Sequence, residues 1–237
     1  MRRTLLGVIV AITLTAAAVV LITARVVSPR VEPLEPPLPT PRVDSEDAFP
    51  WEGAITLVDD SGQRLTWTVE RVDGEVHLLG ERPNWRVEHR ARPDGTPLLT
   101  VKQSGGLTTR VTWLPEGARV ERTDATGKSS TVTIREPGLW DESTVAARLA
   151  GLSWVPGKQV RLRIADLDLA DGRVYPMIAE YVRQERRDGL ACARVHLAID
   201  DFRRLVSPNF EFCFSSAAGA KLLQYDGEGF TFRAVSP

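Results

Sequence analysis

The stretch RLTWTVERVDGEVHLLGERPNWRVEHRA, residues 64–91, contains three short runs in which apolar and polar residues alternate. In the first run, Leu65, Trp67 and Val69 fall on one side of an extended chain, whereas Thr66, Thr68 and Glu70 fall on the other. The segments VDGE and RPN separate the runs, and both are typical of tight turns. This period of two predicts β-strands joined by hairpins.

The same pattern continues through the rest of the chain, apart from one interruption. Ten further runs follow: PLLTVKQ, LTTRVTWL, ARVERT, STVTIRE, KQVRLRIADLD, VYPMIAEYVRQE, LACARVHLAI, NFEFCFS, KLLQY and GFTFRAV. The interruption begins at a helix-capping residue, Asp141 or Ser143, and ends near Leu149 before Gly151. We therefore expect one mainly β domain over residues 51–237, with about a dozen antiparallel strands and one short helix.

Residues 1–27 predict a signal anchor or a signal peptide. The uncharged run 4–24 lies between Arg2-Arg3 and Arg25, and a membrane span needs about 20 mostly apolar residues. Arginines before the run favour a cytoplasmic N-terminus, so we expect an inner-membrane helix with the remainder exported; signal cleavage is the alternative. The proline-rich residues 28–50 are expected to form an extended linker.

Charge and motif patterns argue against nucleic-acid binding and against catalysis. Lys and Arg total 30 against 31 Asp and Glu, a net charge of -1, and the basic residues are dispersed. His77, His89 and His196 lie in separate strands without metal-ligand spacing, so we expect them to be exposed or to lie in cross-strand pairs. No serine lies in a GxSxG turn. We expect a protein that is not an enzyme and that has no cofactor, metal or nucleic-acid partner, with an envelope hydrolase as the least favoured alternative.

Both cysteines fall out of phase with the apolar residues of their strands. Cys192 alternates with Ala191, Ala193 and Val195, and Cys213 alternates with the phenylalanines of NFEFCFS. We therefore expect both cysteines on the outer face of neighbouring strands. In an oxidising compartment such a pair favours a Cys192–Cys213 disulfide, because a zinc site needs more ligands and a redox site favours CxxC.

Aromatic residues recur on the core face of several strands. They fill a core, or they line an apolar cavity inside a curved sheet that is open to a hydrophobic ligand; the sequence leaves both interpretations open. The candidates for lining such a cavity are Trp67, Trp85, Trp113, Phe210, Phe212, Phe214, Phe230 and Phe232.

The second half of the chain carries four short motifs in a fixed order. They are the helix start at 141–144, the Pro-Gly-Lys turn at 156–158, the strand at 189–195 and the aromatic strand at 210–214. In these motifs the chain resembles an exported bacterial family, domain of unknown function 3108, although FCFSSAAG stands where that family has a tryptophan and an acidic turn.

That family is similar in fold to the periplasmic lipoprotein-carrier (LolA-like) proteins. The resemblance implies a strongly curved antiparallel sheet, an open half-barrel, wrapped around the short helix. It would place Val145, Leu149 and Leu152 against the aromatic strands, which adds them to the cavity candidates.

These observations predict a non-enzymatic protein of the periplasm or cell envelope. Its half-barrel would bind a lipid or another hydrophobic ligand, or a protein partner of the envelope. The alternative is an accessory or scaffolding subunit of an envelope assembly, with a filled core.

Overall fold

The computed structural model describes residues 48–167, 172–187, 190–200, 209–215, 220–227 and 230–235, with the backbone alone at Arg187 and Phe230. The predicted signal anchor at 1–27 and almost all of the predicted linker lie outside these residues. Within the described part of the chain, no helix is long and apolar enough to cross a membrane.

The first eight strands form a ladder of hairpins. They are β1 (Gly53–Asp59), β2 (Arg64–Val72), β3 (Glu75–Arg82), β4 (Trp85–Ala91), β5 (Pro97–Ser104), β6 (Leu107–Leu114), β7 (Gly117–Thr123) and β8 (Ser129–Ile134). Leu65, Trp67 and Val69 are buried, as the alternation predicts. Asp73 and Gly74 both have positive φ, 52° and 79°, which suits the tight hairpin turn between β2 and β3.

A short helical segment follows β8 and the three-residue strand β9 (Leu139–Asp141). It consists of a 3₁₀ turn, η1 (Glu142–Thr144), and the helix α2 (Val145–Leu149). The Asp141 carboxylate accepts a hydrogen bond from the Ser143 backbone N–H at 2.9 Å and so caps the turn. The short helix predicted to begin at Asp141 or Ser143 and to end near Leu149 is therefore confirmed.

The chain then returns through a second set of strands. They are β10 (Gln159–Ala165), β11 (Val174–Arg187), β12 (Leu190–Ile199), β13 (Phe210–Ser215), β14 (Leu222–Gly227) and β15 (Phe230–Ala234). Neighbouring strands pair antiparallel except β9, which runs parallel to β10. The spatial order is β8-β7-β6-β5-β4-β3-β2-β1-β15-β14-β13-β12-β11-β10-β9, one 15-stranded sheet in which β1 pairs with β15.

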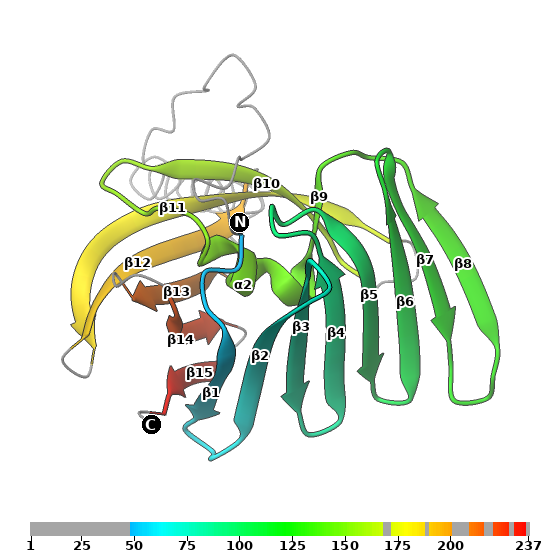
Figure 1. Ribbon diagram of the computed structural model, residues 1–237, viewed down its shortest axis with the longest axis horizontal. Helices are drawn as coiled ribbons and strands as arrows, with labels where there is room; N and C mark the ends of the chain where they lie inside the picture. Colours follow the sequence, from blue (N-terminus) through cyan, green and yellow to red (C-terminus); the bar gives the residue numbers. More distant parts are fainter. Residues whose placement is uncertain are drawn as a thin grey trace, which may run out of the picture. The chain divides into compact units, whose positions relative to one another are not determined.

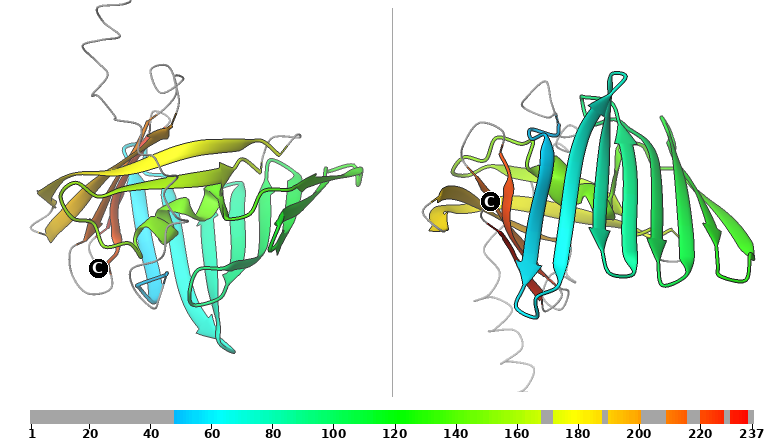
Figure 2. Two further views of the ribbon diagram at one scale, coloured as in Figure 1. Left: turned by 90° about the horizontal axis from the view of Figure 1, so that it is seen from above. Right: turned by 60° about the horizontal axis from the view of Figure 1, so that its bottom comes forward.

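The sheet is open and strongly curved, and α2 lies inside the curve (Figures 1 and 2). Its 15 strands exceed the expected dozen because β1 and β9 were not anticipated. The apolar residues of β1 run together as Ala54-Ile55 and Leu57-Val58, and β9 is too short for alternation to show. The mainly β architecture with one short helix is as predicted.

Two apolar cores lie along the inner face. The larger packs β1–β4 against the helix and against β10–β15. The smaller, which includes Val111, Val120 and Leu167, lies where the ends of the sheet approach each other. Ala48 and Phe49 are fully buried in the larger core. These two residues fall in the predicted linker, so the packed part of the chain includes residues before Trp51.

Candidate functional site

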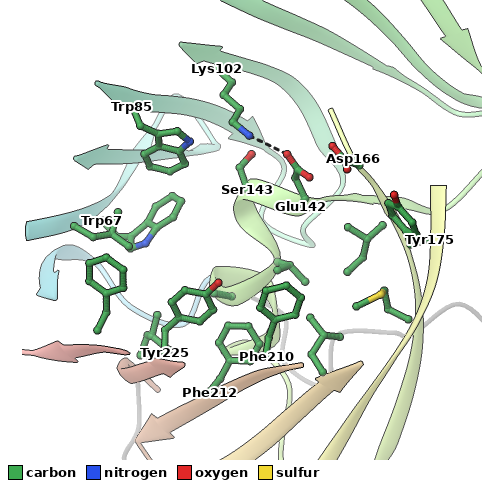
Figure 3. A pocket seen from close by; sticks show the side chains of 18 of the residues that line it. Trp67, Trp85, Lys102, Glu142, Ser143, Asp166, Tyr175, Phe210, Phe212 and Tyr225 are labelled. Atoms are coloured by element: carbon green, nitrogen blue, oxygen red, sulfur yellow. Dashed lines mark hydrogen bonds and ion pairs between the residues drawn. The ribbon is translucent and has the colours of Figure 1, made fainter. Parts of the chain in front are cut away.

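A pocket of about 660 Å³ opens on the concave side of the sheet, beside the helical segment (Figure 3). Strands from both halves of the sheet contribute to its walls, and Val145 and Ala146 of α2 close one side. The volume is within the range of about 300–1,000 Å³ that is usual for small-molecule sites. The curvature of the sheet thus leaves a space that the helix only partly fills.

One wall of the pocket is aromatic. Phe210 and Phe212 of β13 alternate inward, and Tyr225 of β14 lies between them and Phe232 of β15. The rings stack with centroids 6.3 Å apart for Phe210–Tyr225, 5.4 Å for Phe212–Tyr225 and 6.3 Å for Tyr225–Phe232. Such parallel, offset rings are a favourable aromatic arrangement and form a continuous apolar surface.

Two tryptophans form an adjoining wall. Trp67 of β2 and Trp85 of β4 meet edge to face, with ring centroids 5.7 Å apart. The Trp67 ring lies over Gly80 of β3 so closely that a Cβ there would be 2.5 Å from a ring carbon. Because Gly80 has no side chain, there is room for the Trp67 ring in the position in which it borders the pocket.

The opposite side of the pocket is polar. Lys102 of β5 donates to Glu142 of η1, with Nζ 2.8 Å from Oε1, and Ser143 and Asp166 lie beside this pair (Figure 3). The Lys102 side chain is 6% exposed and that of Glu142 is 28% exposed. A buried ammonium group that borders an apolar pocket is held there by its carboxylate partner, because an unpaired charge would be costly to bury.

The cap of the helical segment positions two of these polar groups. Asp141 accepts hydrogen bonds from both the backbone N–H and the hydroxyl of Ser143, which fixes the turn that carries Glu142 toward Lys102. The Ser143 proton is therefore committed to Asp141, and the Ser143 oxygen can only accept a hydrogen bond from a molecule in the pocket.

A buried polar cluster lies behind this turn. His89 of β4 is 1% exposed; its Nδ1 is 2.8 Å from the Thr100 hydroxyl and 3.8 Å from a carboxylate oxygen of Asp141. Trp113 donates to the same hydroxyl at 3.0 Å. Burial lowers the pKa of His89 to about 4, an effect that Asp141 opposes and Arg148 reinforces. His89 is therefore neutral near pH 7.

Arg148 of α2 completes the cluster. Its guanidinium lies 3.9 Å from the centroid of the Trp140 ring, a cation–π contact. Burial lowers the pKa of Arg148 to about 10, and the carboxylates of Asp141 and Asp94 partly offset the decrease. Arg148 remains charged at pH 7, and the carboxylates of Asp141 and Asp94 compensate part of its buried charge.

The structure divides the predicted cavity residues into three groups. Six of them line the pocket: Trp67, Trp85, Val145, Phe210, Phe212 and Phe232. Leu149, Leu152 and Phe214 are buried in the larger core instead, and Trp113 packs against the smaller one. The side chain of Phe230 lies outside the described residues.

Lys102, Glu142, Ser143 and His89 were not among the predicted site residues. His89 carried a signal, because it is in phase with Val87 and Ala91, both fully buried on β4. We expected the histidines to be exposed or to lie in cross-strand pairs, and for His89 exposure is wrong. Lys102 had no comparable signal, since its burial depends on Glu142, 40 positions later in the sequence.

Cys192 and Cys213 form the predicted disulfide, with Cα atoms 5.6 Å apart. They share the face of β12 and β13 with Arg194, opposite the one that Phe212 and Phe214 present to the core. This face is not open to solvent at the cysteines, which are 0% and 1% exposed. Arg194 forms ion pairs there with Glu185, Glu211 and Asp226.

One group of three metal-ligand side chains occurs among the described residues. It combines Glu185 with the two cysteines, and their ligand atoms lie within 4.8 Å of one another. Both sulfurs are joined in the disulfide and do not offer the thiolates that a metal requires.

Comparison with protein-family models finds no match for this chain, and no curated protein matches its sequence. Among solved structures, it is similar to a β-barrel-like protein of the domain of unknown function DUF1849 from Brucella abortus. The two share 11% sequence identity over 77% of this chain and 93% of the other, with a TM-score of 0.49. The resemblance to domain of unknown function 3108 stays a prediction.

Proposed function

We propose that the domain binds a hydrophobic small molecule, a lipid or acyl chain, in the pocket on its concave side. The observation that carries this proposal is the pocket of about 660 Å³ with a continuous aromatic wall. An aromatic wall of this kind would lose contact with water when an apolar chain covers it, which gives about 25 cal/mol for each Å² buried.

The polar groups beside the pocket support a binding role more than a catalytic one. The Ser143 hydroxyl donates to Asp141, and His89 bonds to Thr100 through Nδ1. A serine nucleophile would instead need its proton to go to a histidine that an acid orients. The arrangement stabilises the turn at η1, and we propose that the protein is not an enzyme.

We place this activity outside the cytoplasm, in the periplasm or cell envelope. The disulfide supports an oxidising compartment, and the uncharged run at residues 4–24 supports an anchor in the inner membrane. In this proposal the open sheet and its short helix enclose the ligand, as expected for a half-barrel of the lipoprotein-carrier type. A protein partner in the envelope is the second candidate.

The test is native mass spectrometry of the purified full chain, followed by extraction of any bound lipid. Val145→Trp places a large ring where α2 borders the pocket, and Val182→Trp, at an exposed position of β11, is its matched control. We expect a lipid adduct on the wild type and on Val182→Trp, and at least tenfold less on Val145→Trp.

Two results would contradict the proposal. One is a wild-type protein that carries no adduct and that binds no added twelve-carbon amphiphile. The other is equal retention by both tryptophan variants. Either result would favour the accessory or scaffolding role, with function on the outer surface.

A further inference from the structure

The charged groups around the pocket are not distributed evenly. Lys102, Glu142 and Asp166 are buried or half-buried on the polar side, whereas Arg82 and Arg173 are exposed at the rim. The Arg82 guanidinium lies over the outer tryptophan, Trp85, at 5.4 Å from the ring centroid. Exposed rim charges are screened by water and salt, so the three more buried groups dominate the field within the pocket.

These three groups carry one positive and two negative charges. Lys102 is already paired with Glu142 at 2.8 Å, so an anionic head group would have to displace that carboxylate. A cationic head group would have to approach the Lys102 ammonium in a poorly solvated space. Both kinds of ion would also lose most of their own hydration on entry.

An uncharged head group avoids these costs and can still satisfy the polar side. Lys102 can donate to a carbonyl oxygen, because its ammonium has three N–H donors. The Glu142 carboxylate accepts from a hydroxyl or amide N–H, and so does the Ser143 oxygen, whose proton goes to Asp141. Donors and acceptors thus lie together at one end of a pocket whose other end is aromatic (Figure 3).

We propose that the ligand is a neutral amphiphile: an acyl chain whose head group combines a carbonyl with hydroxyl or amide groups, as in an acylglycerol or an acylated amide. The chain lies against Phe212 and Tyr225, and the head group lies at Lys102, Glu142 and Ser143. This inference rests on the proposed function, since it names the ligand class of the same pocket.

The experiment compares three ligands that share a twelve-carbon chain: monolauroylglycerol, laurate and dodecylamine. Their dissociation constants for the full-length protein are measured by titration calorimetry at pH 8, below the concentrations at which they form micelles. We expect the neutral glycerol ester to bind at least tenfold more tightly than either ion.

Glu142→Gln tests the origin of the preference. It keeps a hydrogen-bond acceptor for Lys102 and removes the negative charge, so the preference for the ester over laurate should decrease at least tenfold. Glu88→Gln, on the exposed side of β4 and away from the pocket, is the matched control and should keep the wild-type preference. Asp166→Asn removes the other carboxylate and should act in the same direction, which keeps the test available if Glu142→Gln does not fold.

The outcomes separate this inference from the proposed function. If the wild type binds the three ligands equally, or if neither Glu142→Gln nor Asp166→Asn changes the preference, the neutral head group is wrong while hydrophobic binding stands. If the wild type binds none of them and carries no adduct, the proposed function fails as well.

Discussion

His89 shows how one buried residue couples this fold to pH. Burial holds its pKa near 4 in the folded protein, against an ordinary value of 6.5. Between these two pH values the unfolded chain binds a proton that the folded protein does not bind. Protonation therefore favours the unfolded state, and stability decreases as the pH is lowered through this window.

We expect the free energy of unfolding to decrease by about 3 kcal/mol between pH 6.5 and pH 4 on account of His89 alone, at about 1.4 kcal/mol per pKa unit. In His89→Gln this contribution should be absent, so that its unfolding free energy depends less steeply on pH. Urea unfolding at several pH values measures both slopes. His77→Gln, at a partly exposed position of β3, is the control, and an unchanged slope in His89→Gln would contradict the prediction.

At the scale of elements, the helical segment is fixed by charge as well as by apolar packing. Asp141 caps η1. Its carboxylate also does more than that of Asp94 to raise the pKa of Arg148, which lies buried in α2. Removal of one member of a buried pair leaves an uncompensated charge, which is usually worth about 3–5 kcal/mol. Because Asp141 also caps the turn that carries Glu142, we expect its loss to disturb the polar side of the pocket as well.

We expect Asp141→Ala to lower the free energy of unfolding by about 3 kcal/mol or more. Arg148→Met added to Asp141→Ala should cost less than the sum of the two single changes, because no buried charge then remains without a partner. Asp124→Ala is a matched control: Asp124 caps a turn in the same way, through Thr126 and Lys128, but at an exposed hairpin. Asp124→Ala should lower the free energy of unfolding by only about 1 kcal/mol. If the losses of unfolding free energy at Asp141 and Arg148 simply add, the two charges do not interact.

The disulfide joins two neighbouring strands, β12 and β13, over a sequence separation of 21 residues. Loss of such a crosslink releases chain entropy in the unfolded state and is worth about 3 kcal/mol. We expect Cys192→Ser with Cys213→Ser to lower the unfolding free energy by that amount while ligand binding persists, because the cysteines and the pocket lie on opposite faces. Loss of binding in a variant that remains fully folded would contradict this separation.

The sequence was most informative where one side of a strand is apolar and the other is polar. Alternation found β2, β3 and β4 and placed Trp67 and Trp85 on the pocket face. It fails in β5, where Thr100 and Lys102 point inward while Leu99 and Val101 are only half-buried. Buried polar residues need partners that are remote in sequence, so no local pattern could identify this side of the site.

On the scale of the whole molecule, the two ends of the sheet are consecutive in sequence but are not paired. β8 and β9 are opposite edges of the 15-stranded order, and the smaller core joins them through Ile134 and Leu139. Arg122 of β7 connects the two sides, since its guanidinium donates to the Leu167 carbonyl from Nε at 3.1 Å and from Nη2 at 2.8 Å. This contact joins β7 to the chain just after β10, near the other end of the sheet.

We expect Arg122→Met to lower the free energy of unfolding by about 2 kcal/mol, the usual worth of a buried hydrogen bond from a charged group. Because the methionine preserves apolar contact but cannot hold Leu167, the two ends should separate more often. Amide hydrogen exchange should then accelerate in β7 and β8 and leave β2 and β3 unchanged. Arg119→Met, on the same strand with a side chain that is 57% exposed, should behave as the wild type. Equal amide exchange in both variants would show that the smaller core alone holds the two ends of the sheet together.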